Sequence, residues 1–458
     1  MYSLFKFQFR VLQRDYFPGS EDRINLQATL HELKSKAPFE IPVLVNGEKI
    51  YTGRTAEQRV PSDHKTVLAK FHEADPSIIE KAIKGALAMK PILESYSLSD
   101  RSAIFLKAAD LAAGKYRRKL LAATMLGQGK NTLQAEADAA AELIDFWRFN
   151  CKFAHEIYQQ QPPKNSIGVW NRLEYRPLEG FIYAISPFNF TAIGGNLPSV
   201  PALMGNVILW KPSPYAIFSN WIIMEILKEA GLPDGVIQFI PGDAEEITEK
   251  ILRSPYFHYI LLDQPLIVGE TGGKNFHVIH KSADVKNAVN QTIRGAFEYQ
   301  GQKCSACSRA YIPDALWDNF REMFLNEISK NAVSFEKIKG HIEWAKNDKD
   351  SEIIAGGTYD NSKGYKADEY EQILDMVNET SPYALTGSIF AKDRSAIMLG
   401  ETKLRHASGN FYINDKSTGA IVGQQPFGGS RVSRTNDKIG SSSLKTLSIL
   451  KNLAIHQI

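Results

Sequence analysis

The chain has few cysteines and no marked excess of charge of either sign. Only three of its 458 residues are cysteine (Cys151, Cys304 and Cys307), too few for a disulfide framework, which favours a reducing compartment. Lysine and arginine number 54 against 51 aspartate and glutamate, so the net charge of +3 does not indicate a nucleic-acid partner. No apolar run approaches the roughly 18 residues that a membrane span requires. These absences, with 43% hydrophobic residues and a length of 458 residues, predict a globular protein with two or three domains.

Several nucleotide-binding and hydrolase motifs are also missing. Gly127-Gln128-Gly129 lacks the third glycine of a dinucleotide fingerprint and lies in a helical context. Gly273-Lys274 mimics the end of a phosphate loop, but Val268 replaces its first glycine and Asn275 its serine or threonine. No serine lies in a Gly-x-Ser-x-Gly motif. A P-loop enzyme, a glycine-fingerprint dehydrogenase and a serine hydrolase are therefore unsupported.

What the sequence does contain is a nucleophile and a base in two short motifs. Cys304 follows Gly301-Gln302-Lys303, and Glu270 lies in Gly269-Glu270-Thr271-Gly272-Gly273. A thiolate attacks a carbonyl carbon, and a carboxylate can later activate water to release the acyl group. This pair predicts thioester chemistry.

The Cys304-x-x-Cys307 spacing has two other interpretations. It could form half of a zinc site, but Cys151 lies alone in a helical stretch and other ligands are not evident. It could be a thioredoxin-like redox pair, although that motif belongs on the first strand–helix turn of a domain of about 100 residues. We interpret Cys307 as a small buried apolar residue and expect no metal.

The order of apolar patterns predicts an α/β fold. Residues 76–160 show helical periodicity and end at the paired prolines Pro162-Pro163. Strands then alternate with helices, which predicts a parallel, helix-covered sheet. Strands are expected at 181–185, 207–210, 236–240, 276–279, 310–312, 387–391 and 410–414, and helices at 216–230, 245–253, 285–299 and 316–328.

The first fourteen residues contain no acidic side chain. Lys6, Arg10 and Arg14 recur every four residues, as in a basic amphipathic transit peptide, although serine is scarce. An ordinary surface segment is the alternative.

Five blocks together resemble the aldehyde dehydrogenase superfamily, from about residue 40 to about residue 435. Each block alone is a weak signal, whereas all five in this order are specific. The blocks are Ser186-Pro187-Phe188-Asn189-Phe190, Trp210-Lys211-Pro212-Ser213, Gly269-Glu270-Thr271-Gly272-Gly273-Lys274, Gly301-Gln302-Lys303-Cys304 and Pro426-Phe427-Gly428-Gly429. Longer stretches at 134–150, 191–196, 297–307 and 409–429 resemble the branch that oxidises L-glutamate 5-semialdehyde to L-glutamate in proline degradation, in the mitochondrial matrix.

The resemblance implies a role for each catalytic residue. Cys304 is the expected nucleophile, and its anion is expected to be favoured by neighbours such as Lys303 or by the positive ring of the cofactor. Asn189 and the Cys304 backbone N–H resemble the donors of an oxyanion hole. Glu270 resembles the base that deacylates the thioester. The bland alternatives are a turn residue for Asn189 and a surface acid for Glu270.

Cofactor and substrate residues follow from the same resemblance. Lys211 and Ser186 resemble the residues that hold the adenosine half of NAD at the end of parallel strands. Gly419 and Ala420 match a loop whose N–H groups hold the α-carboxylate of the substrate, and relatives usually have serine at the second position. The remaining expected substrate residues are Ser305 beside this loop, Phe427 as an aromatic wall and Glu142 near the amino group, with a solvated helix face as the alternative for Glu142.

The implied architecture is a Rossmann-type NAD domain, an α/β catalytic domain and a small oligomerisation flap. We expect the first over residues 1–262 with the flap near 155–178, the second over 263–430 and a divergent tail over 431–458, assembled as a homodimer or higher oligomer. Three family segments are missing, near residues 260–266, after Lys330 and near 364–368. Three interpretations stay open: an active glutamate semialdehyde dehydrogenase, an impaired variant of it, or a dehydrogenase for another small aldehyde.

Overall fold

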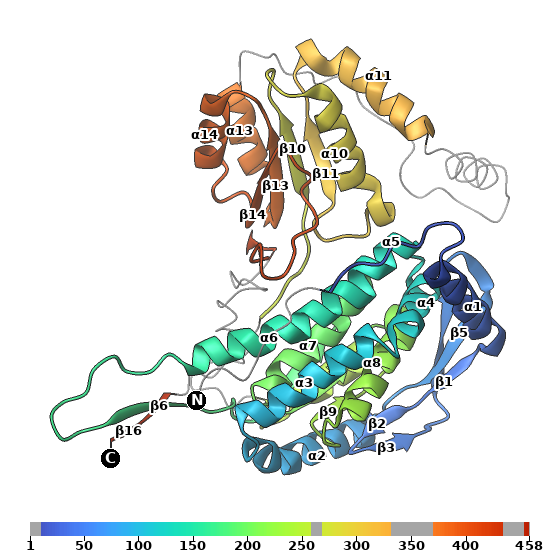
Figure 1. The fold of residues 1–458 in the computed structure, drawn as a ribbon, viewed down its shortest axis with the longest axis vertical. Helices are drawn as coiled ribbons and strands as arrows, with labels where there is room; N and C mark the ends of the chain where they lie inside the picture. The colour runs from blue at the N-terminus through green and yellow to red at the C-terminus, as the bar shows by residue number, and fades with distance from the viewer. Residues whose placement is uncertain (1–10, 258–267, 331–369, 434–452, 458) are drawn as a thin grey trace. The chain divides into compact units, whose positions relative to one another are not determined.

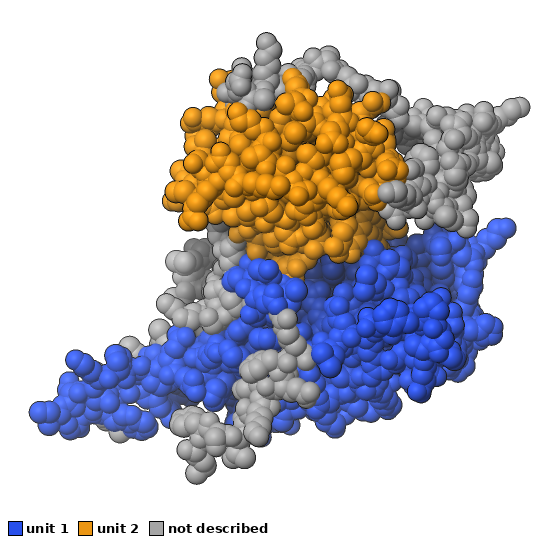
Figure 2. Space-filling model, turned by 45° about the horizontal axis from the view of Figure 1, so that its top comes forward, with its two compact units in different colours: residues 1–267, 421–426, 437–458 blue, residues 268–420, 427–436 orange. Residues whose placement is uncertain are grey.

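The computed structural model describes residues 11–257, 268–330, 370–433 and 453–457. The chain divides into two compact units (Figure 2). Unit 1 comprises residues 1–267, 421–426 and 437–458, and unit 2 comprises residues 268–420 and 427–436. The domain boundary expected at residues 262 and 263 lies outside the described residues.

Helices dominate unit 1 between residues 76 and 158, as the apolar periodicity predicts (Figure 1). Asp75 begins α2, because its carboxylate accepts hydrogen bonds from the N–H groups of Ser77 and Ile78. The series ends at Tyr158, shortly before the paired prolines. The helices of unit 1 are α1 (Glu21–Lys36), α2 (Pro76–Glu94), α3 (Leu98–Ala113), α4 (Arg117–Gln128), α5 (Thr132–Ala135), the π-helix η1 (Glu136–Glu142), α6 (Leu143–Tyr158), α7 (Thr191–Leu203), the short 3₁₀ helix η2 (Pro214–Ala216), α8 (Ile217–Ala230) and α9 (Ala244–Leu252).

Unit 1 contains the predicted parallel strands. β7 (Ile182–Ile185), β8 (Ile208–Lys211) and β9 (Ile237–Phe239) are parallel neighbours, joined by the crossover helices α7 and α8. β2 (Val43–Val45) and β3 (Glu48–Ile50) extend this sheet in the order β3-β2-β9-β8-β7, with β2 antiparallel to β9. The β2–β3 hairpin turns at Asn46-Gly47, with φ of 54° and 81°. The prediction missed this hairpin, although Asn-Gly is a strong hairpin signal.

Two further sheets of unit 1 were not predicted. β5 (Asp63–His72) lies between β1 (Phe39–Ile41) and β4 (Thr55–Val60). β6 (Asn171–Tyr175), within the stretch predicted to form the flap, pairs antiparallel with β16 (Leu453–Gln457) from the predicted tail.

Unit 2 is a parallel sheet with helices on both faces (Figure 1). The strand order is β11 (Cys307–Tyr311), β10 (Asn275–Ile279), β13 (Thr386–Phe390) and β14 (Asn410–Ile413). Phe276 and Val278 face the apolar cluster with α13 (Tyr370–Glu379) and α14 (Arg394–Lys403). Ile279 faces the opposite cluster, with α10 (Val285–Phe297) and α11 (Asp314–Lys330). Because strand side chains alternate between faces, β10 is buried on both sides.

β11 begins earlier than predicted. The prediction placed its start at residue 310, whereas the strand starts at Cys307 and follows Cys304 almost directly. A two-residue antiparallel pair, β12 (Tyr383–Ala384) with β15 (Ser430–Arg431), completes unit 2. None of the helices in the described part of the chain combines the length and the apolar composition that crossing a lipid bilayer requires.

Candidate active site

The loop that carries Cys304 reverses the chain between the 3₁₀ turn η3 (Glu298–Gly301) and β11. Tyr299, Gln300 and Gly301 all have positive φ, of 55°, 53° and 72°. Two consecutive non-glycine residues in this region cost roughly 1–3 kcal/mol each, so surrounding contacts must hold the turn. Tyr299 is buried at its centre and the thiol-bearing residue follows three positions beyond Gly301.

Asn275 fixes the backbone on the other side of the thiol. Its side-chain amide donates to the carbonyl oxygens of Cys304 and Ala306, each over 2.8 Å. Its oxygen accepts from the Thr386 N–H over 2.9 Å. Gly273 makes this approach possible, because a Cβ there would lie 2.5 Å from the Cys304 carbonyl oxygen. Asn275, one of the two residues that exclude a phosphate loop in the sequence, therefore holds the loop that carries the Cys304 thiol.

The Glu270 carboxylate acts electrostatically on the Cys304 thiol within unit 2. Burial raises the pKa of the Cys304 thiol well above its usual range, and the charge and hydrogen-bonding capacity of Glu270 raise the pKa further. Glu270 itself is exposed to solvent. The predicted nucleophile is thus held in its protonated form, and the predicted base contributes to that effect.

The Lys303 ammonium has a carboxylate partner of its own. Its ammonium lies 3.3 Å from the Glu298 carboxylate, so that partner compensates much of its charge. The expectation that Lys303 favours the thiolate stays a prediction.

Cys307 has a different environment from Cys304. It is buried in β11, and its thiol donates to the Arg309 carbonyl oxygen over 3.3 Å. Burial raises the pKa of Cys307 to about 12. The described residues include no cluster of three or more His, Cys, Asp or Glu side chains suited to a metal. These surroundings agree with the interpretation of Cys307 as a buried apolar residue.

The segment Asp415–Ala420 follows β14 and returns to the thiol loop. Gly419 has φ of 97°, a conformation that favours glycine. Ser305 donates its hydroxyl hydrogen to Thr418 Oγ1 over 2.8 Å, and the Ser417 hydroxyl donates to the Ser305 carbonyl oxygen over 3.2 Å. The structure therefore brings Ser305 together with the predicted carboxylate loop. The single hydroxyl proton of Ser305 is engaged with Thr418, so it holds the two segments together.

Sequence reasoning missed Lys416. A Cβ on Gly419 would lie 3.4 Å from the Lys416 Nζ, so this ammonium lies beside the predicted carboxylate nest. Its nearest carboxylate, Asp415, is 3.9 Å away, and its side chain is 19% exposed. The sequence offers only the three-residue spacing of Lys416 and Gly419 as a signal, because the positive φ of Gly419 is a property of the folded chain.

Phe427 lies on a second segment beside the base. The Phe427 side chain is half-buried. A few residues beyond it, the Ser433 carbonyl oxygen accepts from the Thr271 N–H and the Val432 carbonyl oxygen accepts from the Thr271 hydroxyl. Gly428 donates its N–H to the Asn410 side chain over 3.0 Å. This close backbone approach requires Gly409, where a Cβ would clash with the Gly428 carbonyl.

Unit 1 carries the predicted cofactor residues at the carboxyl ends of β7 and β8. Ser186 donates its N–H to the Lys211 carbonyl oxygen over 3.2 Å, and its hydroxyl accepts from Trp210 Nε1 over 2.9 Å. Lys211 is 6% exposed, and among the described residues it has no ion-pair partner. Burial lowers the pKa of Lys211, which the charge of Asp243 partly offsets. A buried ammonium at this edge of a parallel sheet requires an oxygen-rich ligand.

Asn189 is held indirectly by a buried carboxylate. It is half-buried and precedes Phe190, whose ring lies 4.1 Å from the Lys130 ammonium. Lys130 pairs with Asp138 over 2.6 Å. Asp138 also accepts from the first N–H groups of α7, at Thr191 and Ala192, over 3.0 and 2.9 Å.

Asp138 lies in the π-helix η1, which also contains Glu142. Such π-turns occur frequently at functional sites. Glu142 is half-buried at the end of η1. The predicted site residues are thus distributed over both units, with Cys304, Glu270, Ser305, Gly419, Ala420 and Phe427 in unit 2 and Asn189, Ser186, Lys211 and Glu142 in unit 1.

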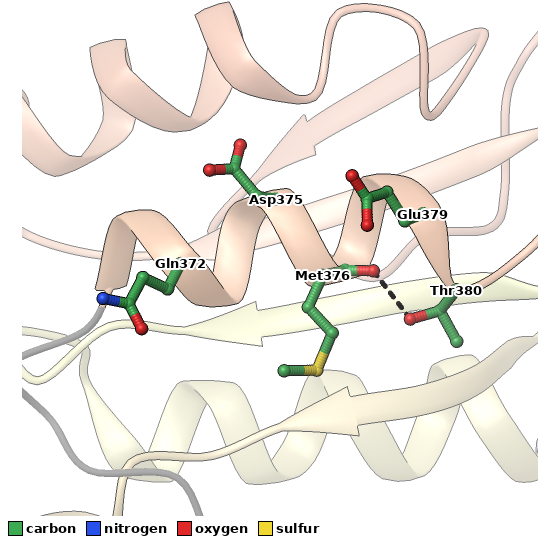
Figure 3. A pocket seen from close by; sticks show the side chains of 5 residues that line it. All are labelled: Gln372, Asp375, Met376, Glu379 and Thr380. Atoms are coloured by element: carbon green, nitrogen blue, oxygen red, sulfur yellow. Dashed lines mark hydrogen bonds between the residues drawn. The ribbon is translucent and has the colours of Figure 1, made fainter.

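A hollow on the described surface lies away from these residues. It has a volume of about 430 Å³ and follows one face of α13 (Figure 3). It is lined by Gln372, Asp375, Met376, Glu379 and Thr380. All five side chains come from a single helix and its end, so this hollow has no converging polar groups of a catalytic site.

Comparison with known families identifies the group to which the sequence belongs. The model of the aldehyde dehydrogenase family matches residues 51–262, 264–343 and 364–453. The chain belongs to the aldehyde dehydrogenase family. The match extends beyond residue 435, where we expected the resemblance to end, into the tail predicted to be divergent.

Individual relatives of this aldehyde dehydrogenase cover nearly its whole length. It is 49% identical to the delta-1-pyrroline-5-carboxylate dehydrogenase of Agaricus bisporus, over 94% of this chain and 91% of that protein. It is 43% identical to the mitochondrial human enzyme of that name, over 92% of this chain and 87% of that protein. A crystal structure of the Mycobacterium tuberculosis delta-pyrroline-5-carboxylate dehydrogenase bound with NAD superimposes with a TM-score of 0.85, at 38% identity, covering 98% of this chain and 95% of that one.

This aldehyde dehydrogenase is internally shorter than its relatives. The alignment with the Agaricus enzyme spans 500 residues, more than the 458 of the chain, so that enzyme has residues with no counterpart here. The family match is interrupted at residue 263 and between residues 343 and 364, close to two of the three predicted gaps. These positions lie outside the described residues. That the gaps weaken NAD binding stays a prediction, which a calorimetric titration with NAD would test.

The residues of unit 1 fit NAD. Lys211, buried and without an ion-pair partner among the described residues, would supply a donor for ribose hydroxyls, and Ser186 lies beside it on the adjacent strand end. Phe188 and Tyr215, exposed with ring centroids 6.5 Å apart, offer apolar surface at the same sheet edge.

Proposed function

We propose that this chain oxidises L-glutamate 5-semialdehyde, formed from 1-pyrroline-5-carboxylate, to L-glutamate with NAD. The observation that carries the proposal is the Cys304 loop, tied through Ser305 to the segment Lys416–Ala420, with the Glu270 carboxylate acting on the Cys304 thiol. This arrangement combines a nucleophile and a base with a candidate anion site. The names of the relatives from Agaricus bisporus and human support the same substrate.

The first step is proton transfer and attack. Glu270 accepts the thiol proton, and the sulfur attacks the aldehyde carbon. A C–S bond forms while the carbonyl π electrons move to oxygen. We assign the Asn189 amide and the Cys304 N–H as donors to this oxyanion, each worth about 3–4 kcal/mol of transition-state stabilisation.

Hydride loss leaves a thioester on Cys304, and NAD, when bound, accepts that hydride. Because Glu270 is exposed, it can release its first proton to solvent. It then removes a proton from water as the water oxygen attacks the thioester. The C–S bond breaks, L-glutamate leaves, and the thiolate is reprotonated.

Substrate choice depends on the segment after β14. The N–H groups of Gly419 and Ala420 would hold the α-carboxylate, with the Lys416 ammonium beside them. Glu142 would pair with the amino group and Phe427 would border the aldehyde chain. The proposed setting is the mitochondrial matrix, which the human relative's name supports. The proposed assembly is a homodimer or higher oligomer through a flap near residues 155–178.

A substrate panel tests this function. Purified chain with NAD should form NADH from L-glutamate 5-semialdehyde with a kcat/KM at least tenfold above that for pentanal, which has the same chain length without the α-substituents. Equal rates with both aldehydes would refute carboxylate recognition. No NADH from either would refute the assigned activity.

A further inference from the structure

One face of the unit 2 sheet carries a strip of buried polar side chains. Asn275 and His277 on β10 alternate with the apolar residues Phe276 and Val278, which face the other way. His277 pairs in register with Ser388 on β13. His277 and Ser388 are fully buried, and Asn275 is 1% exposed. Burying a polar side chain costs folding free energy unless it is hydrogen-bonded, so the hydrogen-bond partners of these residues indicate their role.

The partners of His277 determine its tautomer. The Ser417 N–H donates to Nε2 over 3.2 Å, and a backbone N–H can only donate. Nε2 therefore carries no proton, and Nδ1 donates its proton to Thr292 Oγ1 on α10, 2.9 Å away. Burial lowers the pKa of His277 to about 3, so the ring stays neutral near neutral pH. Its proton is fixed in place and takes no part in acid–base exchange.

His277 thereby connects the sheet to both functional segments. Ser417, held by Nε2, bonds in turn to the Ser305 carbonyl oxygen beside Cys304. Two positions further along is Gly419. Ser388 adds a second attachment by donating to the Asp415 carbonyl oxygen over 2.6 Å. The segment 415–418 has no regular secondary structure, so these side chains replace the strand pairing that holds β14.

We propose that His277 is a positioning residue for substrate recognition. By holding the Ser417 N–H it fixes the segment Asp415–Ala420 against the thiol loop, and this sets the preference for aldehydes that carry an α-carboxylate. The inference rests on the proposed function and deepens it. His277 does not contact the substrate. It influences substrate preference through Ser417 and Ser305.

The chain offers graded variants of this contact. His277→Leu removes the acceptor and leaves the buried Ser417 N–H unpaired. His277→Gln places an amide oxygen near the position of Nε2 and should restore the acceptor. Thr292→Val removes the acceptor of the Nδ1 proton, which leaves that buried N–H unpaired and loosens the hold on the ring. Val278→Ala is the matched control, because it damages the same strand on the opposite face.

The measurement is kcat/KM for L-glutamate 5-semialdehyde and for pentanal in each variant. His277→Leu should lower the semialdehyde value about tenfold or more and the pentanal value less than about threefold. Thr292→Val should shift the ratio the same way, and His277→Gln should recover most of it. Val278→Ala should reduce thermal stability without changing the ratio.

A second readout is independent of turnover. L-Glutamate binding, measured by calorimetry without cofactor, should weaken about tenfold in His277→Leu and stay unchanged in Val278→Ala. Equal loss for both aldehydes, or failure of His277→Gln to restore the ratio, would assign His277 a purely structural role and overturn the inference. If the wild-type chain does not oxidise the semialdehyde but glutamate binding is still weaker in His277→Leu than in wild type and Val278→Ala, only the proposed function is refuted. If the wild-type chain does not bind glutamate, the proposed function and the role of His277 are both refuted.

Discussion

The two units hold their functional residues by different means. In unit 1, Lys211 and Ser186 are at the ends of parallel strands whose other residues, except the exposed Ile185, belong to or pack against one large apolar cluster. In unit 2, Cys304 and Gly419 lie on irregular segments attached by Asn275, His277, Ser305 and Ser417. Strand ends are placed by the packing of the sheet itself, whereas irregular loops need specific side-chain hydrogen bonds. Mutations should therefore act through stability in unit 1 and through loop position in unit 2.

The largest contrast is expected between the two cysteines of unit 2. Cys304→Ala should reduce aldehyde oxidation by at least about a thousandfold, because no covalent intermediate can form. Cys307→Ala should retain most activity, since its thiol is buried in β11 and bonded to a backbone carbonyl. Steady-state NADH formation measures both. Equal losses would favour a redox pair and contradict the assignment of Cys304.

In unit 1 the buried carboxylate of Glu136 is expected to contribute strongly to stability. Its carboxylate, fully buried, pairs with Arg117 and accepts from the Arg14 N–H and the Tyr16 hydroxyl. Glu136→Gln leaves Arg117 uncompensated and should reduce the free energy of unfolding by about 3–5 kcal/mol. Urea denaturation followed by tryptophan fluorescence checks this.

The control is Glu32→Gln, which breaks the exposed pair with Lys36 and should change the urea midpoint little. An equal change of the urea midpoint in both variants would contradict the larger contribution to stability expected from the buried Glu136 carboxylate. The contacts of Val11, Arg14 and Tyr16 also attach residues 11–16 to the body of unit 1.

Lys211 tests whether unit 1 binds the cofactor. Lys211→Met preserves the apolar stem but removes the buried ammonium, and should weaken NAD binding about tenfold to a hundredfold. Lys115→Met, at an exposed lysine paired with Glu229, is the control. Calorimetric titration with NAD measures the dissociation constants. An unchanged constant in Lys211→Met would remove Lys211 from the cofactor site.

The charge of Glu270 gives a pH prediction within unit 2. A negative charge beside a thiol raises its pKa, so Glu270→Gln should lower the pKa of Cys304 and increase the thiolate fraction at any given pH. Alkylation of Cys304 by iodoacetamide at pH 8 should become about tenfold faster, while turnover falls for lack of the base. The alkylation rate should rise with pH in both proteins, with the rise shifted to lower pH in the variant. Slower alkylation in Glu270→Gln would contradict the geometry.

The smallest expected effect concerns Ala420. Ala420→Ser should lower the KM for L-glutamate 5-semialdehyde about threefold to tenfold, if the hydroxyl regains one neutral hydrogen bond of about 0.5–1.5 kcal/mol. Pentanal serves as the internal control, since it has no carboxylate. An equal change for both aldehydes would place residue 420 outside carboxylate recognition.

Local patterns predicted most of the elements that carry the site. The helical run to Tyr158 and the strands ending at Ile185 and Lys211 were found because their signals lie within a few consecutive residues. The β1-β5-β4 sheet was missed because short strands at residues 39–72 are defined by pairing partners that a local pattern does not reveal. The start of β11 was misplaced because Ser308 and Arg309 are polar on an edge strand.

The sequence by itself determined the chemistry available to this protein. Cys304 and Glu270 are recognisable because thioester chemistry requires a thiol and a carboxylate, whereas Lys211 and Asn189 are indicated by the resemblance of their motifs to the family. The tertiary structure decided how that chemistry is held. Only the register of β10 with β13 and the return of residues 415–418 bring His277, Ser417 and Ser305 together, although they are far apart along the chain. The raised pKa of Cys304 likewise depends on burial and on the approach of Glu270, which are properties of the folded chain and not of any local pattern.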